Sequence, residues 1–98
     1  MRLDKIQRKA LKTALQSLEA NDKAFLFGSR VDDDKRGGDI DVLVFSQQPS
    51  FELSRKMTRD FFKCCEEKVD ILVINPLSMS EEQALFIDSI DKIPLSNL

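Results

Sequence analysis

The chain has 98 residues and a formal net charge of −2, which predicts one globular domain spanning residues 1–98. The acidic balance excludes the broad basic footprint of a general nucleic-acid binder. No apolar run approaches the roughly 20 residues that span a bilayer, so we expect a cytoplasmic protein that contacts neither membranes nor nucleic acid directly. The chain contains no histidine, so any general base must be a carboxylate, a lysine or a cysteine. Histidine-based triads are therefore excluded.

The first part of the chain predicts one helix followed by two strands. Residues 3–20 are expected to form an amphipathic helix, because apolar residues recur there every three or four positions. Residues 23–27 are a short apolar run ended by Gly28, which is typical of a buried strand. Residues 29–38 form a polar loop, and residues 39–46 predict a second strand rich in β-branched side chains.

The second part predicts a helix, a third strand and a last helix. Residues 51–66 have helical apolar spacing, and residues 68–74 predict the third strand. A capping box that begins at Ser80 opens the last helix, which is expected to extend until Pro94 limits it. A strand–helix–strand order favours a parallel pair. The fold class expected is α/β, with a small mixed β-sheet of about three strands flanked by helices, in the order α-β-loop-β-α-β-α.

Carboxylates stand where buried strands begin, which is an unusual place for a charge. Asp39 and Asp41 are two residues apart, so they are expected to share one face of the second strand. Asp70 lies near the start of the third strand, and parallel neighbours begin at the same end of a sheet. We therefore expect Asp39, Asp41 and Asp70 to converge, where they could hold a divalent cation such as magnesium for phosphoryl transfer.

A glycine–serine turn ends the first strand and is a candidate for binding phosphate. Gly28 would let a phosphate approach the backbone, Ser29 would add a hydroxyl, and Arg30 could reach a phosphate oxygen. The first strand must run antiparallel to the second if this turn is to meet the acids. Each feature has a plainer interpretation when taken alone, namely an ordinary turn, a polar strand entry, a solvated arginine or an exposed edge residue.

The combined pattern resembles a known family signature. Residues 28–44, GSRVDDDKRGGDIDVLV, resemble the signature of the DNA polymerase beta-like nucleotidyltransferase superfamily: Gly-Ser, a short loop, Asp-x-Asp and a later strand carboxylate. The resemblance covers residues 24–74, and the short chain looks like the minimal nucleotidyltransferases of bacteria and archaea. The loop between Ser29 and Asp39 is one residue shorter than a common version in the family. We expect none of the extra domains with which larger relatives bind nucleic acids or antibiotics.

The resemblance implies roles for these residues. Asp39 and Asp41 would bind magnesium and the nucleoside triphosphate, here ATP. Asp70 would complete the metal site and help to deprotonate the attacking hydroxyl, while Gly28 and Ser29 would hold the phosphates. Minimal members commonly pair with a small helical HEPN protein, often a ribonuclease toxin. They serve as its antitoxin, and some transfer AMP from ATP to a tyrosine of that partner.

Two functions of different classes remain open from the sequence. The chain is either a protein adenylyltransferase or a non-catalytic antitoxin that neutralises a helical partner by covering it. Basic side chains on the second helix, Arg55, Lys56 and Arg59, and apolar residues between Phe86 and Ile93 would carry the second function. The nucleotide, the stoichiometry and the oligomeric state are not specified by any pattern in the chain.

Overall fold

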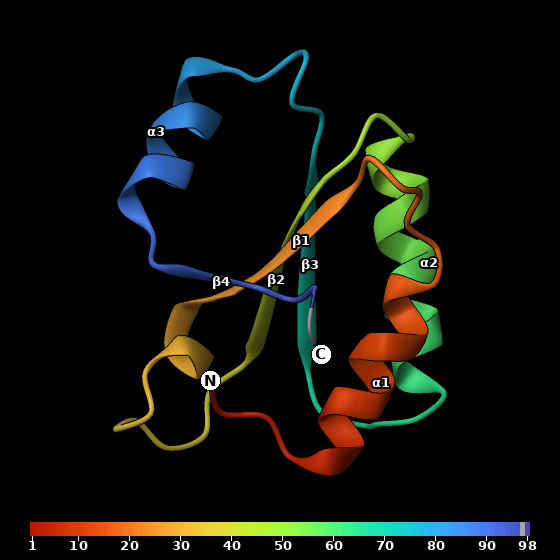
Figure 1. Ribbon diagram of the computed structural model, residues 1–98, viewed down its shortest axis with the longest axis vertical. Coiled ribbons are helices and arrows are strands. Elements are labelled where there is room, and N and C mark those ends of the chain that lie inside the picture. The colour runs from red at the N-terminus through yellow and green to blue at the C-terminus, as the bar shows by residue number, and fades with distance from the viewer. Residues whose placement is uncertain (97) are drawn as a thin grey trace.

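The molecule is a four-stranded sheet with helices on both faces, seen here in a computed structural model that describes residues 1–96 and 98. Two helices, α1 and α2, lie along one face, and α3 lies on the other (Figure 1). The elements in chain order are α1 (Lys5–Leu15), β1 (Lys23–Phe27), the 3₁₀ helix η1 (Gly28–Val31), β2 (Ile40–Phe45), α2 (Ser50–Phe62), β3 (Val69–Ile74), α3 (Glu81–Ser89) and β4 (Lys92–Pro94).

The sheet is mixed, as the sequence predicts. Its strand order is β3-β2-β1-β4. Strand β1 runs antiparallel to β2, whereas β2 and β3 are parallel and joined by α2. The end of β1 therefore meets the starts of β2 and β3 at the same end of the sheet. This arrangement confirms the predicted α/β fold.

Helix α1 is shorter than its apolar periodicity suggests. It begins with a capping box in which the side chain of Asp4 accepts from the backbone N–H of Gln7. It ends at Leu15 because the following backbone bonds tighten to a three-residue spacing, from Leu18 N–H to Leu15 O. The expected range of 3–20 therefore combined a helix with a turn whose leucines also pack inward.

The sequence missed strand β4. The last helix was expected to continue to Pro94, but it ends at Ser89, and Ile90 is already extended. Residues Lys92–Pro94 instead pair antiparallel with β1 at the edge of the sheet. An edge strand tolerates a proline because the missing N–H costs no ladder bond there, so Pro94 did not mark a helix end as we had assumed.

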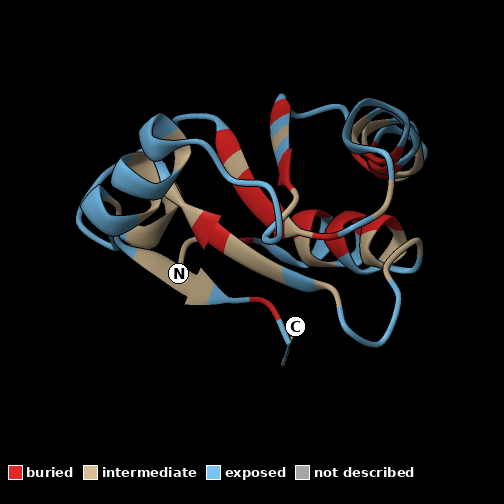
Figure 2. Ribbon diagram, turned by 90° about the horizontal axis from the view of Figure 1, so that it is seen from above, coloured by how far each residue is buried: buried red, intermediate tan, exposed pale blue. Residues whose placement is uncertain are grey.

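The hydrophobic core lies between the sheet and the helix pair α1 and α2. Leu26, Ile40, Val42 and Val44 are buried on that face of the sheet, and buried residues line the inner sides of both helices (Figure 2). Alternation along β2 sends the intervening residues to the opposite face. Helix α3 meets that opposite face through an edge-to-face contact of Phe86 with Phe27, with ring centroids 5.6 Å apart.

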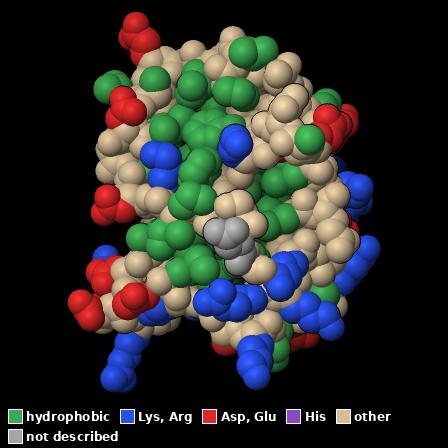
Figure 3. Space-filling view, viewed as in Figure 1, with side chains coloured by type: hydrophobic (Ala, Val, Ile, Leu, Met, Phe, Trp, Pro, Cys, Tyr) green, Lys and Arg blue, Asp and Glu red, His purple; other side chains and the backbone are tan. Residues whose placement is uncertain are grey.

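Hydrophobic and basic side chains occupy different parts of the surface. Hydrophobic side chains gather over α3 and β4, whereas Lys and Arg side chains gather over α1 (Figure 3). Within the described residues, no helix has the length and apolar character needed to cross a membrane.

Candidate active site

Two of the predicted acids are direct neighbours across the sheet. Asp41 of β2 is in register with Asp70 of β3, and on its other side it is in register with Phe27 of β1. Residues in register point to the same face, so these side chains lie on the face opposite α1 and α2. The expectation that Asp70 approaches Asp41 is confirmed in this geometry.

Asp39 stands just before β2, because the strand begins at Ile40, one residue later than predicted. Its Oδ2 lies 3.4 Å from Nζ of Lys68, and its side chain is about half exposed. Lys68 is brought there because its carbonyl accepts from the N–H of Ile40 at 3.2 Å. No pattern in the sequence pointed to Lys68, because only the parallel register places the residue before β3 beside the residue before β2.

The three carboxylates act on one another electrostatically. Burial raises the pKa of Asp41 above its ordinary value, the charges of Asp70 and Asp39 raise this pKa further, and Lys68 opposes the shift. Within residues 1–96 and 98, no group of three acidic or sulfur side chains is already gathered as a cation site. Metal binding by Asp39, Asp41 and Asp70 therefore stays a prediction.

The Gly28 turn lies against Asp41. Gly28 has a φ of 73°, a region that L-residues with side chains rarely adopt. A Cβ atom added at this position would collide with Oδ2 of Asp41. The backbone of the turn and the carboxylate are therefore as close as a glycine permits, and this contact confirms that the turn and the acids share one end of the sheet.

Ser29 begins the loop of residues 29–38, and its side chain lies against Gly38 at the other end of that loop. Gly38 has a φ of 87°, and a Cβ atom there would collide with Oγ of Ser29. The loop thus folds back on itself, and Ser29 lies next to the residue that precedes Asp39. This arrangement places the predicted phosphate-binding hydroxyl close to the predicted acids.

Arg30 makes contacts that the sequence did not suggest. Its Nε donates to the carbonyl of Gly38 at 3.1 Å, and its Nη1 donates to the carbonyl of Arg2 at 3.1 Å and to Oε1 of Gln7 at 3.3 Å. Nε thus binds the end of the loop, and Nη1 binds the N-terminal segment and helix α1. Binding of a phosphate by Arg30 stays a prediction.

A groove of about 440 Å³ opens beside the turn. Its walls combine apolar side chains with two carboxylates and one lysine; it is lined by Phe27, Gly28, Val31, Asp32, Lys35, Ile90 and Asp91. Gly28, which lies against Asp41, thus forms part of the wall of this groove.

Fold and site together define a small α/β protein in which two carboxylates and a glycine turn meet at one end of the sheet, and comparison with protein families specifies the class. The profile of the family described as Polymerase beta, Nucleotidyltransferase matches residues 9–90. The chain therefore belongs to this nucleotidyltransferase family, within the DNA polymerase beta-like superfamily. A comparison with curated proteins finds no match to this chain.

Proposed function

We propose that this protein is a magnesium-dependent adenylyltransferase that moves AMP from ATP to a tyrosine hydroxyl of a helical HEPN-type toxin, and so acts as its antitoxin. The observation that carries the proposal is the meeting of Asp41, Asp70 and the Gly28 turn at one end of the sheet. Membership of the nucleotidyltransferase family supports the general reaction.

The donor set suits a hard divalent cation. Asp39, Asp41 and Asp70 offer only carboxylate oxygens, which magnesium prefers. Burial raises the pKa of Asp41, and repulsion by Asp70 and Asp39 raises it further. A bound cation offsets that repulsion. When bound, magnesium would neutralise charge on the triphosphate and polarise the phosphorus that is attacked.

The residues of the chain position the reactants and move a proton. Gly28 admits a phosphate to the backbone, and the hydroxyl of Ser29 donates to a phosphate oxygen. Asp70 accepts the proton of the attacking tyrosine. A bond forms between the tyrosine oxygen and the α-phosphorus, the bond from the α-phosphorus to its bridging oxygen breaks, and pyrophosphate leaves with the electron pair.

Access to the acids fits a macromolecular acceptor. Asp70 is exposed on β3, which is an edge strand of the sheet. A tyrosine that projects from a partner's surface can therefore approach Asp70 without entering a closed cavity.

The test uses the protein purified together with the product of the adjacent gene, provided that this product is helical and carries an Arg-x-x-x-x-His motif. The complex is incubated with ATP and magnesium, and each chain is weighed by intact mass spectrometry. We expect one AMP increment on the partner, its loss in Asp41→Asn, and its retention in Asp60→Asn, a matched acid on α2 that pairs with Lys63. Normal labelling by Asp41→Asn would contradict the proposal.

The second function, neutralisation by binding alone, is favoured by one observation. Arg55, Lys56 and Arg59 are all exposed on α2 and together form a basic face suited to an acidic partner. If this function is correct, Asp41→Asn neutralises the toxin as well as the wild type does, and reversal of the three charges to glutamate releases the partner.

A further inference from the structure

The guanidinium of Arg2 holds the loop between the turn and the acids at several points. Nη2 donates to the carbonyl of Ser29 at 2.8 Å and to the carbonyl of Gly37 at 2.9 Å. Nε donates to the carbonyl of Asp32 at 2.7 Å. A single side chain thus connects the first residues of the loop to its last residues.

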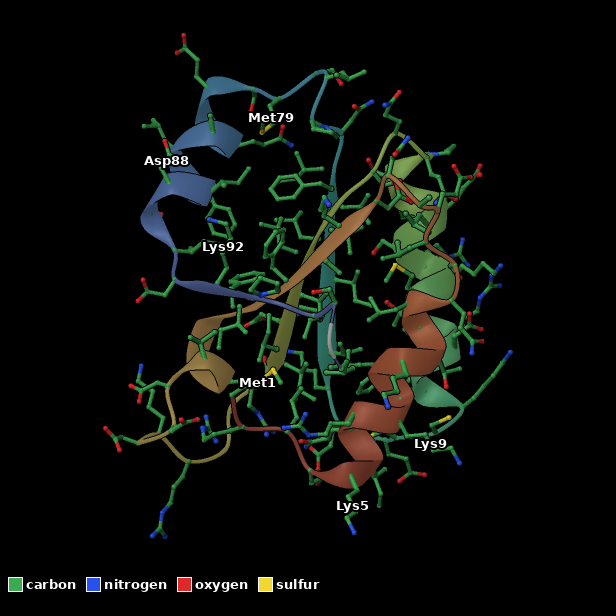
Figure 4. All side chains as sticks on the ribbon, in the orientation of Figure 1. Met1, Lys5, Lys9, Met79, Asp88 and Lys92 are labelled. Carbon is green, nitrogen blue, oxygen red and sulfur yellow. The ribbon has the colours of Figure 1, made fainter. Side chains whose placement is uncertain are left out.

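Arg30 also links the N-terminal segment to the loop. The N–H of Arg2 donates to the carbonyl of Arg30 at 2.8 Å, and Nη1 of Arg30 donates to the carbonyl of Arg2 at 3.1 Å. Nε of Arg30 binds the carbonyl of Gly38. The N-terminal segment lies beside this loop, as the position of Met1 shows (Figure 4).

The two ends of the loop carry the two halves of the candidate site. Ser29 stands at one end, and Asp39 directly follows Gly38 at the other. Residues 32–39 are all exposed, so hydrophobic packing contributes little to the loop's conformation. Ordering such a segment costs conformational entropy that hydrogen bonds must offset, and here arginine side chains provide several of them.

We propose that Arg2 is a positioning residue for nucleotide binding, which fixes the separation between the phosphate-binding turn at Ser29 and the carboxylates that begin at Asp39. This inference rests on the proposed function. Arg2 acts through the loop, because the carbonyl oxygens of the loop accept hydrogen bonds from its Nε and Nη2 atoms. Supporting groups of this kind commonly change affinity about tenfold or more when they are removed.

The test measures the dissociation constant of ATP with magnesium by isothermal titration calorimetry, for the wild type, Arg2→Ala and Arg2→Lys. We expect Arg2→Ala to bind about tenfold more weakly. Arg2→Lys keeps the charge but lacks the planar fork that reaches several carbonyls, so it should recover only part of the affinity. Amide hydrogen exchange of residues 29–38 should be faster in both variants without nucleotide.

Two control variants separate positioning from general stability and charge. Leu18→Ala removes a partly buried side chain that packs on the core, so it lowers the melting temperature without touching the loop. Lys9→Ala removes one positive charge from the exposed surface of α1. Both controls should bind ATP with the affinity of the wild type at a temperature where every variant is folded.

Three outcomes would overturn the inference. The first is an unchanged dissociation constant in Arg2→Ala, and the second is an equal loss of affinity in Leu18→Ala. The third is unchanged amide exchange of the loop in both Arg2 variants. If the wild type binds no ATP, both the inference and the proposed function fail. If the wild type binds ATP and one of the three outcomes above is found, only the inference about Arg2 fails. If Arg2→Ala does not fold, Arg2→Lys provides the same comparison.

Discussion

Gly28 illustrates how one residue can serve the backbone and the site together. Its positive φ ends β1 in a sharp turn, and its missing Cβ leaves room for the carboxylate of Asp41. Any other residue would both strain the turn and push the acid away. The requirement for glycine at this position is therefore steric as well as conformational.

Gly28→Ala should be more damaging than Gly37→Ala. Both positions have a positive φ, and an alanine at either costs about 1–2 kcal/mol of strain. A Cβ at position 37 meets no atom within 4 Å, whereas a Cβ at position 28 meets Asp41. We expect a larger loss in the free energy of unfolding, measured with urea, for Gly28→Ala, and a loss of ATP binding in that variant alone. Equal effects of the two variants would contradict this account.

Asp41→Asn should stabilise the protein at neutral pH in the absence of divalent cations. The pKa of Asp41 is raised above 3.8 in the folded state, so the folded state binds this proton more tightly than the unfolded state does. Ionisation of Asp41 then lowers stability as the pH rises through the folded pKa. Asparagine removes this penalty, and we expect a melting temperature a few degrees higher.

The advantage of Asp41→Asn should shrink as the pH falls from neutrality toward the ordinary carboxyl pKa of 3.8, because the wild-type carboxyl becomes protonated as the pH falls through its raised folded-state pKa. Thermal unfolding measured at several pH values in a chelating buffer would test this prediction. A variant that is less stable than the wild type at neutral pH would contradict a raised pKa of Asp41 caused by burial and by the charges of Asp70 and Asp39.

At the scale of elements, the sequence predicted those parts whose position follows from local spacing. The capping box of α3 follows from neighbouring residues, and the parallel pairing of β2 with β3 follows from the strand–helix–strand order. The predicted start of β2 at residue 39 was one residue early, since the strand begins at Ile40. Strand β4 was missed because three residues that contain a proline carry no periodic signal. These residues form a strand only by pairing with β1, which is far away in the sequence.

The two neighbouring phenylalanines of α2 should differ sharply in their effect on stability. Phe61 is fully buried, whereas Phe62 is 46% exposed, although the two rings touch edge to face. Phe61→Ala should cost about 3–5 kcal/mol of unfolding free energy, and Phe62→Ala about 1 kcal/mol or less. Urea denaturation of both variants measures the difference. Similar costs for both would mean that α2 does not bury the stripe formed by Leu53, Met57 and Phe61.

At the scale of the whole molecule, the site joins segments that are far apart in the chain. The pattern of Gly28, Ser29, Asp39, Asp41 and Asp70 could be found from the sequence because the family signature keeps them in a fixed order. Arg2 and Lys68 could not be found in this way. Each reaches the site through tertiary contacts, Arg2 by hydrogen bonds to the loop and Lys68 by the register of β2 and β3.

The central claim is that Asp39, Asp41 and Asp70 hold a cation opposite the Gly28 turn. Manganese bound with ATP is the most direct probe, because this paramagnetic ion broadens the amide NMR signals of residues close to it. We expect selective broadening at Gly28, Ser29, Asp39, Asp41 and Asp70. Broadening centred instead on the acidic residues 32–34 or 66–67, with these five signals unchanged, would contradict the account.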